Sequence, residues 1–361
     1  MMTSRERTFL ALLHEEPDRP PISATYTPEA ALVLRAEFGR HEDDLGYVMG
    51  NDLIKTTVGV ENSYYMYDTG EYTCPFGVRW RNVRNETGHY TENIGGALYD
   101  DPDGEKLRAY SIPDPENPAL YSNVREAVEK YGEEKFIIGS CQCSIFETAW
   151  YLHGLEQMLV DMAADEDYSN ELFDRIMRFP LRAGLRMIDA GVDMVWLGDD
   201  ISTQLGMMIS VPMWRKYFKE RYAFIFSEYR KKRPDIVIAY HSCGNCEKII
   251  DEMVEIGLDV LNPIQPLAID PFMVKRRYGR KLTMFGAIDV QWLMPYGSAE
   301  EITRSVRECK KYLGAGGGYI LSPAHHIQSD TGLENIKAFY AAAMEPTDYD
   351  SKYTAVAEGC S

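Results

Sequence analysis

Two residues in the segment Tyr240-His241-Ser242-Cys243-Gly244 combine side chains that suit a transition-metal site. His241 and Cys243 stand two positions apart, so on an extended strand both point to the same side. Imidazole and thiolate are good zinc ligands. The glycine that follows indicates that the strand ends here and turns toward a helix. The pair is therefore a candidate metal site, and the alternative is a histidine and a cysteine buried at a strand–helix junction.

The last apolar run of the chain offers a third ligand, because it ends in Ala324-His325-His326. Adjacent residues of a strand diverge, so only one of these histidines can join the pair. We expect one of the two to complete a three-ligand site, just before the helix that follows. Alternatively, one of the two caps that helix or bonds a backbone carbonyl.

Three acidic residues near predicted strands are candidates for acid–base catalysis: Glu147, Asp199 and Asp52. Glu147 opens a predicted helix, where the helix dipole favours a carboxylate in any case, and it is a candidate fourth ligand or general base. Asp199 and Asp200 end the segment Trp-Leu-Gly-Asp-Asp and are placed to orient His241 or to bind substrate, if they do not simply cap the next helix. Asp52 adjoins another predicted strand and has the same interpretations.

Each of these residues lies beside a short apolar run of the sequence. We interpret these runs as the strands that position the candidate site residues. Several runs are apolar throughout, as strands buried on both faces are. They alternate with helical patterns, which indicates βαβ units and a parallel sheet. The runs cover 21–26, 52–59, 135–143, 193–200, 235–243, 259–265, 282–289 and 317–325, and the helical patterns cover 146–164, 167–190, 211–231, 245–256, 299–313 and 331–344. Eight strands predict an α/β fold of the (β/α)8 TIM-barrel type, with its site at the carboxyl ends of the strands.

Residues 1–345 are predicted to form this barrel as a single domain, followed by a tail at 346–361. The aromatic, turn-rich segment 61–110 interrupts the alternation and is predicted to be a β-hairpin insertion near the barrel mouth. Aromatic and apolar groups are expected to line that mouth and to bind a small, weakly charged substrate. The candidates are Trp150, Trp196, Met207 and Tyr240.

Composition excludes several classes of function. The 361-residue chain has a formal net charge of -18, which argues against nucleic acid or an anionic membrane as partner. No apolar run approaches the ~20 residues that span a bilayer. The seven cysteines and the lack of a signal-peptide cleavage site predict reduced thiols and a cytoplasmic location. No Gly-x-Gly-x-x-Gly follows the first strand, so dinucleotide binding has no support.

At these same residues the chain resembles the uroporphyrinogen decarboxylase superfamily, which also contains the corrinoid-dependent methyltransferases of the methylcobalamin:coenzyme M type. The resemblance covers nearly the whole chain and implies a (β/α)8 barrel. Its carriers are RERTFLALLHEEPDRPPI (5–22), IFETAWYLHG (145–154), AGVDMVWLGDD (190–200), YHSCGN (240–245), EIGLDVLNPIQP (255–266), MFGAID (284–289) and SPAHHIQSDTGLENI (322–336).

Two features favour the methyltransferase branch of the superfamily over the decarboxylase branch: a missing arginine motif and the presence of a His-x-Cys pair. The decarboxylases bind their substrate carboxylates with an Arg-Gln-Ala-Gly-Arg motif, which is absent from 25–39, and a porphyrinogen with eight carboxylates would meet a strongly acidic protein. The methyltransferases bind zinc through His-x-Cys at one strand end and a cysteine near the end of the last strand. His241 and Cys243 match the first part. His325 stands at the third position, where the decarboxylases also have a histidine. The resemblance therefore implies that His325 completes a three-ligand set with one open position, and that His326 points elsewhere, into the loop or the helix that follows.

A set of two histidines and one cysteine has one thiolate, so a bound zinc keeps more positive charge and polarises an ether or alcohol oxygen better. The resemblance therefore implies a zinc-dependent methyltransferase. It would move a methyl group between a small O-, N- or S-methyl substrate and a corrinoid (methylcobalamin), which a separate corrinoid protein would carry. The alternatives are a metal-free decarboxylase that uses Asp52 or Asp199 as its acid or base, and a non-catalytic barrel that binds a corrinoid or a metabolite.

Overall fold

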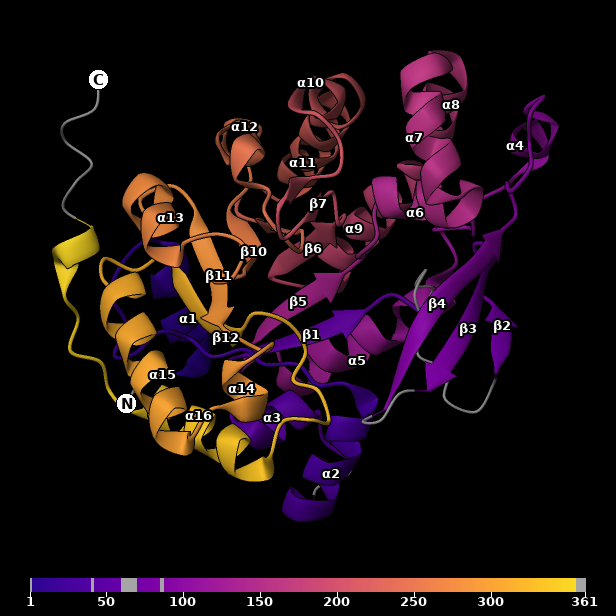
Figure 1. Cartoon of the computed structure of the whole chain (residues 1–361). Coiled ribbons are helices and arrows are strands. Elements are labelled where there is room, and N and C mark those ends of the chain that lie inside the picture. Colours follow the sequence, from indigo (N-terminus) through magenta and orange to yellow (C-terminus); the bar gives the residue numbers. More distant parts are fainter. Residues whose placement is uncertain (1, 40–41, 60–69, 85–87, 355–361) are drawn as a thin grey trace.

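The computed structural model describes residues 2–39, 42–59, 70–84 and 88–354. Its centre is a curled sheet of seven parallel strands surrounded by helices, which confirms the predicted α/β barrel class (Figure 1). Every predicted run from 52–59 onward contains one of these strands. In their order of pairing they are β1 (Leu53–Thr57), β5 (Phe136–Ser140), β6 (Met194–Gly198), β9 (Val237–His241), β10 (Val260–Ile264), β11 (Thr283–Ile288) and β12 (Tyr319–Pro323).

The first predicted strand lies between the two edges of this sheet. Ser23 N–H donates to the carbonyl of Leu321 on β12 (3.0 Å), and the Leu321 N–H donates to the carbonyl of Pro21 (2.9 Å). On the other side, Asp52 N–H donates to the carbonyl of Ile22 (2.8 Å). The segment forms isolated bridges and no continuous ladder, in keeping with a proline that has no N–H to give. It nevertheless occupies the place of the eighth strand.

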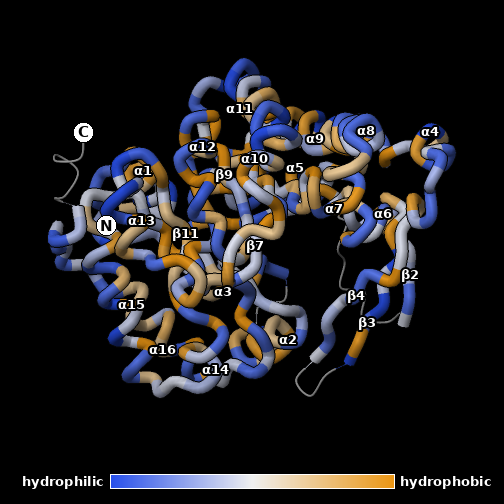
Figure 2. The backbone as a smooth tube through the Cα atoms, turned by 45° about the horizontal axis from the view of Figure 1, so that its top comes forward, coloured by the Kyte–Doolittle hydropathy of each residue, from blue (hydrophilic) through white to orange (hydrophobic). Residues whose placement is uncertain are grey.

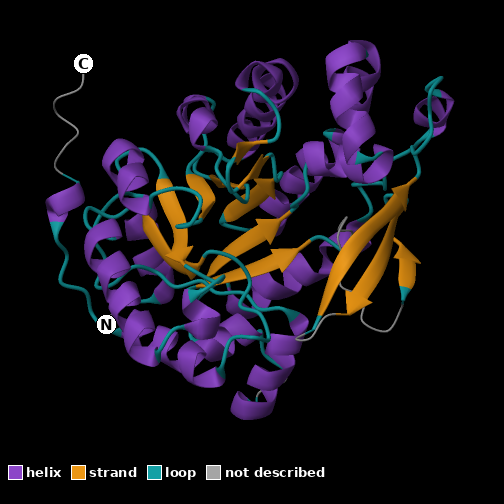
Figure 3. Ribbon diagram, in the orientation of Figure 1, coloured by secondary structure: helices purple, strands orange, loops and turns teal. Residues whose placement is uncertain are grey.

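Helices cover the outside of the sheet, and at least one lies in each connection between consecutive strands (Figure 3). α15 shows why they do so, because Ile302, Val306, Cys309 and Leu313 recur every three or four residues and are buried along one side. Figure 2 shows hydrophilic residues on the same helix. The covering helices are α5 (Ser122–Tyr131), α9 (Arg178–Ala190), α11 (Glu220–Lys232), α12 (Ile250–Glu255), α13 (Pro271–Tyr278), α15 (Ala299–Leu313) and α16 (Leu333–Met344).

Two long helical patterns are divided in the structure. Residues 146–164 form α6 (Phe146–His153) and α7 (Leu155–Ala164), separated at Gly154, whose φ of 94° no helix continues. Residues 167–190 form α8 (Glu166–Ile176) and α9. The remaining short elements are α2 (Pro28–Phe38), α3 (Leu45–Met49), α4 (Glu105–Ala109), α10 (Val211–Trp214), α14 (Leu293–Tyr296), β7 (Ser202–Thr203), β8 (Gly206–Met207), a π-helical turn at Arg215–Lys219, and 3₁₀ turns at Pro118–Tyr121, Glu247–Ile249 and Ser351–Tyr353.

Apolar side chains fill the barrel, and the N-terminal helix α1 (Ser4–Leu12) closes its base. Phe9 of α1 packs edge-on against Phe136 of β5, with ring centroids 5.2 Å apart. The interior layer consists of Leu53, Phe136, Ile138, Met194, Trp196, Ala239, Val260, Phe285 and Ile320. A barrel closed at its base leaves the carboxyl ends of the strands as the place for a site.

Three aspartates, each directly before a strand, join neighbouring chain segments at this base. Each carboxylate accepts a backbone N–H from the adjacent segment and pairs with arginine. Asp52 accepts from Ile22 (2.8 Å), Asp193 from Ile137 (2.9 Å) and Asp259 from Ile238 (2.7 Å). Their arginines are Arg7 and Arg19 for Asp52, Arg5 for Asp193 and Arg230 for Asp259.

Within the segment predicted as an insertion, β2 (Glu71–Thr73), β3 (Val78–Arg84) and β4 (His89–Gly96) form an antiparallel sheet of three strands, beside α6. Trp80 packs edge-on against Tyr151 of α6. Residues 60–69 and 85–87 of that segment lie outside the described part. In the predicted tail, the described residues reach Thr354, and Tyr353 packs against Phe272. Among the described helices, none is both long and apolar enough to cross a membrane.

Candidate metal centre

His241 is the last residue of β9, and Cys243 lies just beyond the strand end. Their side chains point the same way, and Nε2 of His241 is 3.3 Å from Sγ of Cys243. The chain then turns sharply at Gly244 (φ 83°), where a Cβ atom would lie 2.4 Å from the carbonyl oxygen of Thr203. Only glycine fits this turn, so the turn fixes Cys243 at the mouth of the barrel.

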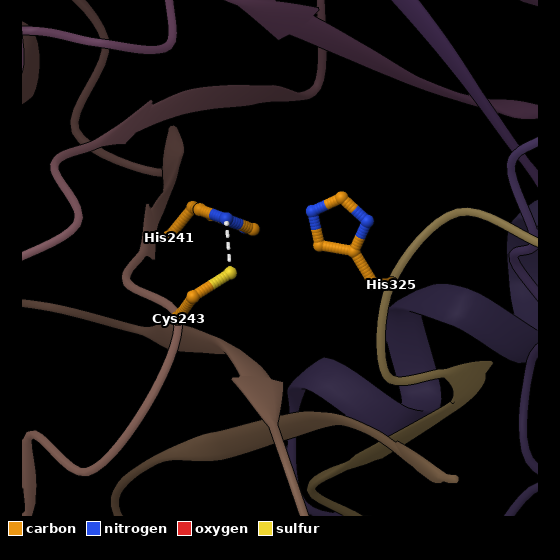
Figure 4. A group of neighbouring side chains, drawn as sticks. All are labelled: His241, Cys243 and His325. Carbon is orange, nitrogen blue, oxygen red and sulfur yellow. Dashed lines mark hydrogen bonds between the residues drawn. The ribbon is translucent and has the colours of Figure 1, made fainter. Parts of the chain in front are cut away.

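His325, which follows β12, faces this pair from across the mouth (Figure 4). The ligand atoms of His241, Cys243 and His325 all lie within 4.8 Å of one another. A tetrahedral zinc holds imidazole and thiolate atoms roughly 3.3–3.6 Å apart, close to the separation of the His241–Cys243 pair. The structure therefore brings together the three residues that the sequence nominated. We call them the triad.

His326 diverges from the triad, as expected for the neighbouring residue. It lines the cavity beside the segment 23–28, and its ring centroid is 4.9 Å from that of His325. Its Nδ1 atom is buried and has no hydrogen-bond partner within the described structure. The expectation that His326 turns into the loop or helix was incomplete, because the ring faces a cavity.

Asn262, in the middle of β10, orients His241. Its Oδ1 lies 2.6 Å from Nδ1 of His241, and its Nδ2 donates to the carbonyl of Phe285 (3.4 Å). Since an amide oxygen only accepts, this contact places the imidazole proton on Nδ1. The lone pair of Nε2 is then available on the side of Cys243. Sequence reasoning missed Asn262, although a polar residue inside an apolar strand was a usable signal.

The surroundings keep both imidazoles neutral and the thiol protonated. Loss of hydration lowers the pKa of His241; the charge of Asp200 opposes this effect and the charge of Lys55 adds to it. Loss of hydration also lowers the pKa of His325 to about 4, with a contribution from His241, although the side of the ring toward the cavity stays exposed. Burial and the nearby Asp200 raise the pKa of the Cys243 thiol. Neutral imidazoles can coordinate a metal directly, and the thiol would lose its proton when a cation binds. This set of side chains suits a dication such as zinc.

Asp200 is the acidic residue next to the triad. Its Oδ1 accepts the backbone N–H of Cys243 (2.7 Å) and lies 3.6 Å from Nε2 of His241. The sequence analysis offered both Asp199 and Asp200 for this role and kept Asp199 as the catalytic candidate. Because adjacent residues diverge, only the second aspartate of the pair reaches the mouth.

Asp199 and Glu147 support the start of α6 instead. The Asp199 carboxylate accepts the N–H groups of Ile145 and Glu147 (3.0 Å each) and the hydroxyl of Tyr222. Burial raises the pKa of Asp199 to about 6. Glu147 accepts from the N–H of Asp200 (2.9 Å) and the hydroxyl of Tyr151 (2.8 Å), and burial raises its pKa well above the usual value. Glu147 is not one of the three converging ligands, and its role as a fourth ligand or general base stays a prediction.

Asp52 requires a correction as a catalytic candidate. It is fully buried at the amino end of β1, where it pairs with Arg7 and Arg19. The barrel interior separates this base from the mouth. A residue that precedes its strand belongs to the base, so the rule that placed the site at the carboxyl ends already excluded Asp52.

Of the four residues expected to line the mouth, Trp196 does so, beside His241 at a ring-centroid distance of 6.0 Å. Tyr240 is the correction, because it alternates with His241 and points outward, edge-on to Tyr222 of α11. Trp150 packs against Tyr151 within α6, and Met207 lies in β8 against the main core. Neither of these two is among the residues that line the three cavities at the mouth.

Cavities adjoin the triad on two sides. Cys243 and His325 border an open cavity of about 750 Å³, rimmed by the exposed Trp292 and Tyr296. His241 and His325 border a narrow space of about 40 Å³ inside the barrel. The triad thus lies between an open cavity and a narrow internal space.

Three comparisons with known proteins show what this chain is similar to. The family model described as uroporphyrinogen decarboxylase (URO-D) matches residues 89–346, which is more than half of the chain. A methylated-thiol–coenzyme M methyltransferase of Methanosarcina mazei is 23% identical over 202 residues, which are 55% of this chain and 51% of that protein. The chain thus spans about half the length of that relative.

Two further relatives are methylcobamide:CoM methyltransferases. MtaA of Methanosarcina barkeri is 22% identical over 235 residues, which are 63% of each chain. MtbA of Methanosarcina acetivorans is 23% identical over 356 residues, which are 94% of this chain and 97% of that protein. A solved methyltransferase structure from Methanosarcina mazei has the same fold, with a TM-score of 0.71, 19% identity and coverage of 95% of this chain and 98% of that one.

Proposed function

The chain belongs to the uroporphyrinogen decarboxylase family, and we propose that it is a zinc-dependent methyltransferase within that family. In this proposal it moves a methyl group between a small methylated substrate and a corrinoid carried by a separate protein. The named relatives are coenzyme M methyltransferases, and this supports the proposal that the transferred group is a methyl group.

The observation on which the proposal depends is the convergence of the triad within 4.8 Å at the barrel mouth. His241, Cys243 and His325 would hold the zinc, which supplies a Lewis acid that polarises the atom bearing the methyl group. Asn262 holds the His241 imidazole so that Nε2 faces the site. The backbone of Cys243 is held by Asp200. The two adjoining cavities would admit the substrate and the corrinoid.

The decarboxylase alternative has less support in the cavities. Within the described residues that line the three cavities at the mouth, Lys55 is the one lysine or arginine. A substrate with many carboxylates would meet too little positive charge there. The two acids proposed for that chemistry are also engaged elsewhere, Asp52 with arginines at the base and Asp199 with the start of α6.

The test compares two cysteines three positions apart. Cys243→Ala should abolish zinc binding and methyl transfer together, while circular dichroism shows a folded barrel. Cys246→Ala is the matched control, because Cys246 is buried in the main core outside the triad and its variant should keep one zinc per chain. Elemental analysis gives the metal content. The absorbance of cobalamin, followed with a panel of methoxy, methylthio and methylamine compounds, gives the transfer.

The proposal is supported if Cys243→Ala loses its zinc and Cys246→Ala keeps it. If Cys243→Ala kept stoichiometric zinc and full activity, the metal role of the triad would be wrong. If the wild-type protein bound zinc but transferred no methyl group from any class of donor, the methyltransferase assignment would be wrong.

A further inference from the structure

The short hairpin of β7 and β8 forms part of the wall of the open cavity of about 750 Å³ that borders the triad. We call this space the outer cavity. Ser202, Thr203 and Gln204 of the hairpin line it, and so do residues 289–292, which follow β11. The two parts of the wall meet where Nε2 of Gln204 donates to Oε1 of Gln291 (2.8 Å). We call this hydrogen bond the latch.

The base of the hairpin holds the turn that carries the metal ligand Cys243. The buried hydroxyl of Ser202 donates to the carbonyl of Cys243 (2.7 Å), and the N–H of Asn245 donates to the carbonyl of Thr203 (2.8 Å). The carbonyl of Thr203 also lies where a Cβ atom on Gly244 would be. These contacts lie on both sides of the ligand along the chain. A displacement of the ligand turn would therefore displace the base of the hairpin with it.

The tip of the hairpin is held much less firmly than its base. Gln204 and Gln291 are both exposed, so water competes for the hydrogen bond between them. Leu205, beside Gln204 at the tip, is 99% exposed, and its N–H donates to the hydroxyl of Thr203 within the hairpin. A hairpin with a buried base and an exposed tip can open at the tip while its base stays attached to the ligand turn.

We propose that the β7–β8 hairpin is a flap of the outer cavity whose closure is coupled to metal binding at the triad. Ser202 is the positioning residue that connects the flap to Cys243. A metal at the triad fixes the ligand turn, the fixed turn steadies the base of the hairpin, and the latch stays closed. Because such coupling is reciprocal, opening the latch weakens metal binding by the same factor. The inference depends on the proposed function for the metal, but it concerns the flap and not the reaction.

Hydrogen exchange on the full chain tests the coupling with zinc alone as the probe. Mass spectrometry follows the amides of peptides that cover 201–208, with zinc bound and after its removal by a chelator. We expect zinc to slow exchange in this segment at least about fivefold more than in α7 and α8. Those two helices contribute no residue to the triad. The comparison separates a local effect from the general stabilisation that any ligand of the folded state gives.

The latch can be broken from either side. Gln204→Ala removes it at the tip of the flap, and Gln291→Ala removes it without altering the hairpin. Each variant should raise the dissociation constant for zinc about 2- to 5-fold, and the double variant should raise it no further, because both substitutions remove one bond. Gln157→Ala is the matched control, since the Gln157 side chain is exposed and donates to Asp161 within α7. Its dissociation constant should equal that of the wild type.

Ser202→Ala removes the hydroxyl that holds the carbonyl of Cys243 and should raise the dissociation constant for zinc about 2- to 10-fold. Ser227→Ala is the control, because it also removes a hydroxyl that donates to a carbonyl, that of Phe224, but at an exposed position of α11. Cobalt in place of zinc adds a spectroscopic measurement. The thiolate–cobalt absorption band should change in Ser202→Ala and not in Ser227→Ala, a difference that lower stability alone would not produce.

Equal slowing of exchange in the hairpin and in α7 and α8 would overturn the inference. Unchanged zinc affinity in both latch variants, or an unchanged cobalt band in Ser202→Ala, would overturn it too. If Ser202→Ala does not fold, hydrogen exchange of the wild-type protein decides.

The proposed function fails separately. Zinc that slows exchange in the hairpin of a protein without methyl transfer would support the flap and refute the methyltransferase. Zinc-dependent methyl transfer with hairpin exchange that ignores zinc would do the opposite. A wild-type protein that binds no zinc would overturn both.

Discussion

The Nδ1 atom of His241 on β9 lies 2.6 Å from Oδ1 of Asn262 on the neighbouring strand β10. The contact is buried on both sides and the amide is itself held by the carbonyl of Phe285. The histidine therefore cannot rotate its ring without breaking a buried hydrogen bond. This relationship fixes which imidazole nitrogen is available to a metal.

Replacing Asn262 should weaken zinc binding without removing a ligand. In Asn262→Leu, the Nδ1–H of His241 loses its acceptor and the ring loses its fixed orientation. We expect zinc affinity to fall on the order of 10- to 100-fold, as for other residues that orient a metal-bound histidine. Competition with a chromophoric chelator measures the affinity. An unchanged affinity in a folded variant would mean that His241 is positioned by packing alone.

Zinc binding should release a proton. Because burial and Asp200 raise the pKa of the Cys243 thiol, the group is protonated at neutral pH and must lose its proton to bind the metal. Zinc affinity should therefore rise about tenfold per pH unit through the neutral range. It should fall more steeply once the pH drops below about 4, where His325 takes up a proton. Calorimetry in buffers of different ionisation enthalpy counts the protons, and a count of zero would exclude Cys243 as a ligand.

Glu147 should behave as a neutral buried acid. Its pKa is raised in the folded protein, so between the usual value of 4.5 and the raised value the folded state binds the extra proton. The free energy of unfolding of the wild-type protein should therefore decrease as the pH rises through that range. Glu147→Gln cannot ionise, so its stability relative to the wild type should increase as the pH rises through the same range.

Urea unfolding at several pH values measures this difference, and Glu147→Ala is the comparison. The alanine variant leaves the hydroxyl of Tyr151 and the N–H of Asp200 without their acceptor, which should cost about 1–3 kcal/mol. A stability difference between the glutamine variant and the wild type that does not change with pH would contradict a protonated Glu147.

Asp52→Ala should destabilise the barrel and leave the chemistry intact. The substitution leaves Arg7 and Arg19 without their buried carboxylate partner. Breaking such a pair should lower the free energy of unfolding by about 3–5 kcal/mol. The zinc content of the folded fraction should not change. Asp235→Ala is the control, since Asp235 is exposed and its loss should shift the free energy of unfolding by less than about 0.5 kcal/mol. A loss of zinc in stable Asp52→Ala protein would return Asp52 to the site.

The barrel and the three converging ligands could be predicted because both follow from short-range rules. Apolar runs that alternate with helical patterns define the strands, and the two-residue repeat of a strand puts His241 and Cys243 on one side. The third ligand is placed at the end of the last strand by the same pattern, and the resemblance to the family selected His325 over His326. The same two-residue repeat, applied consistently, would also have turned Tyr240 away from the mouth.

The contributions of Asn262, Asp200 and Lys55 depend on contacts between strands that are distant in sequence. Asn262 reaches His241 only because β9 and β10 pair with Asn262 opposite His241, and this register is not visible in either segment. Lys55 had a visible signal, a charged residue in an apolar strand, but its neighbour Trp196 is 141 positions away along the chain. Asp199 and Asp200 are distinguishable only when the direction of each side chain is known.

The aspartates at the barrel base have a consequence for the opposite end of the molecule. Asp52, Asp193 and Asp259 each grip a specific backbone N–H of a neighbouring segment, so sliding one strand past another by a single residue would break a hydrogen bond and separate an aspartate from its arginine. Such a slip in β9 would also exchange the faces of its side chains, with His241 toward the helices and Tyr240 toward the cavity. These ion pairs therefore fix the register of the strands at the base, and that register sets the distances between the metal ligands at the mouth.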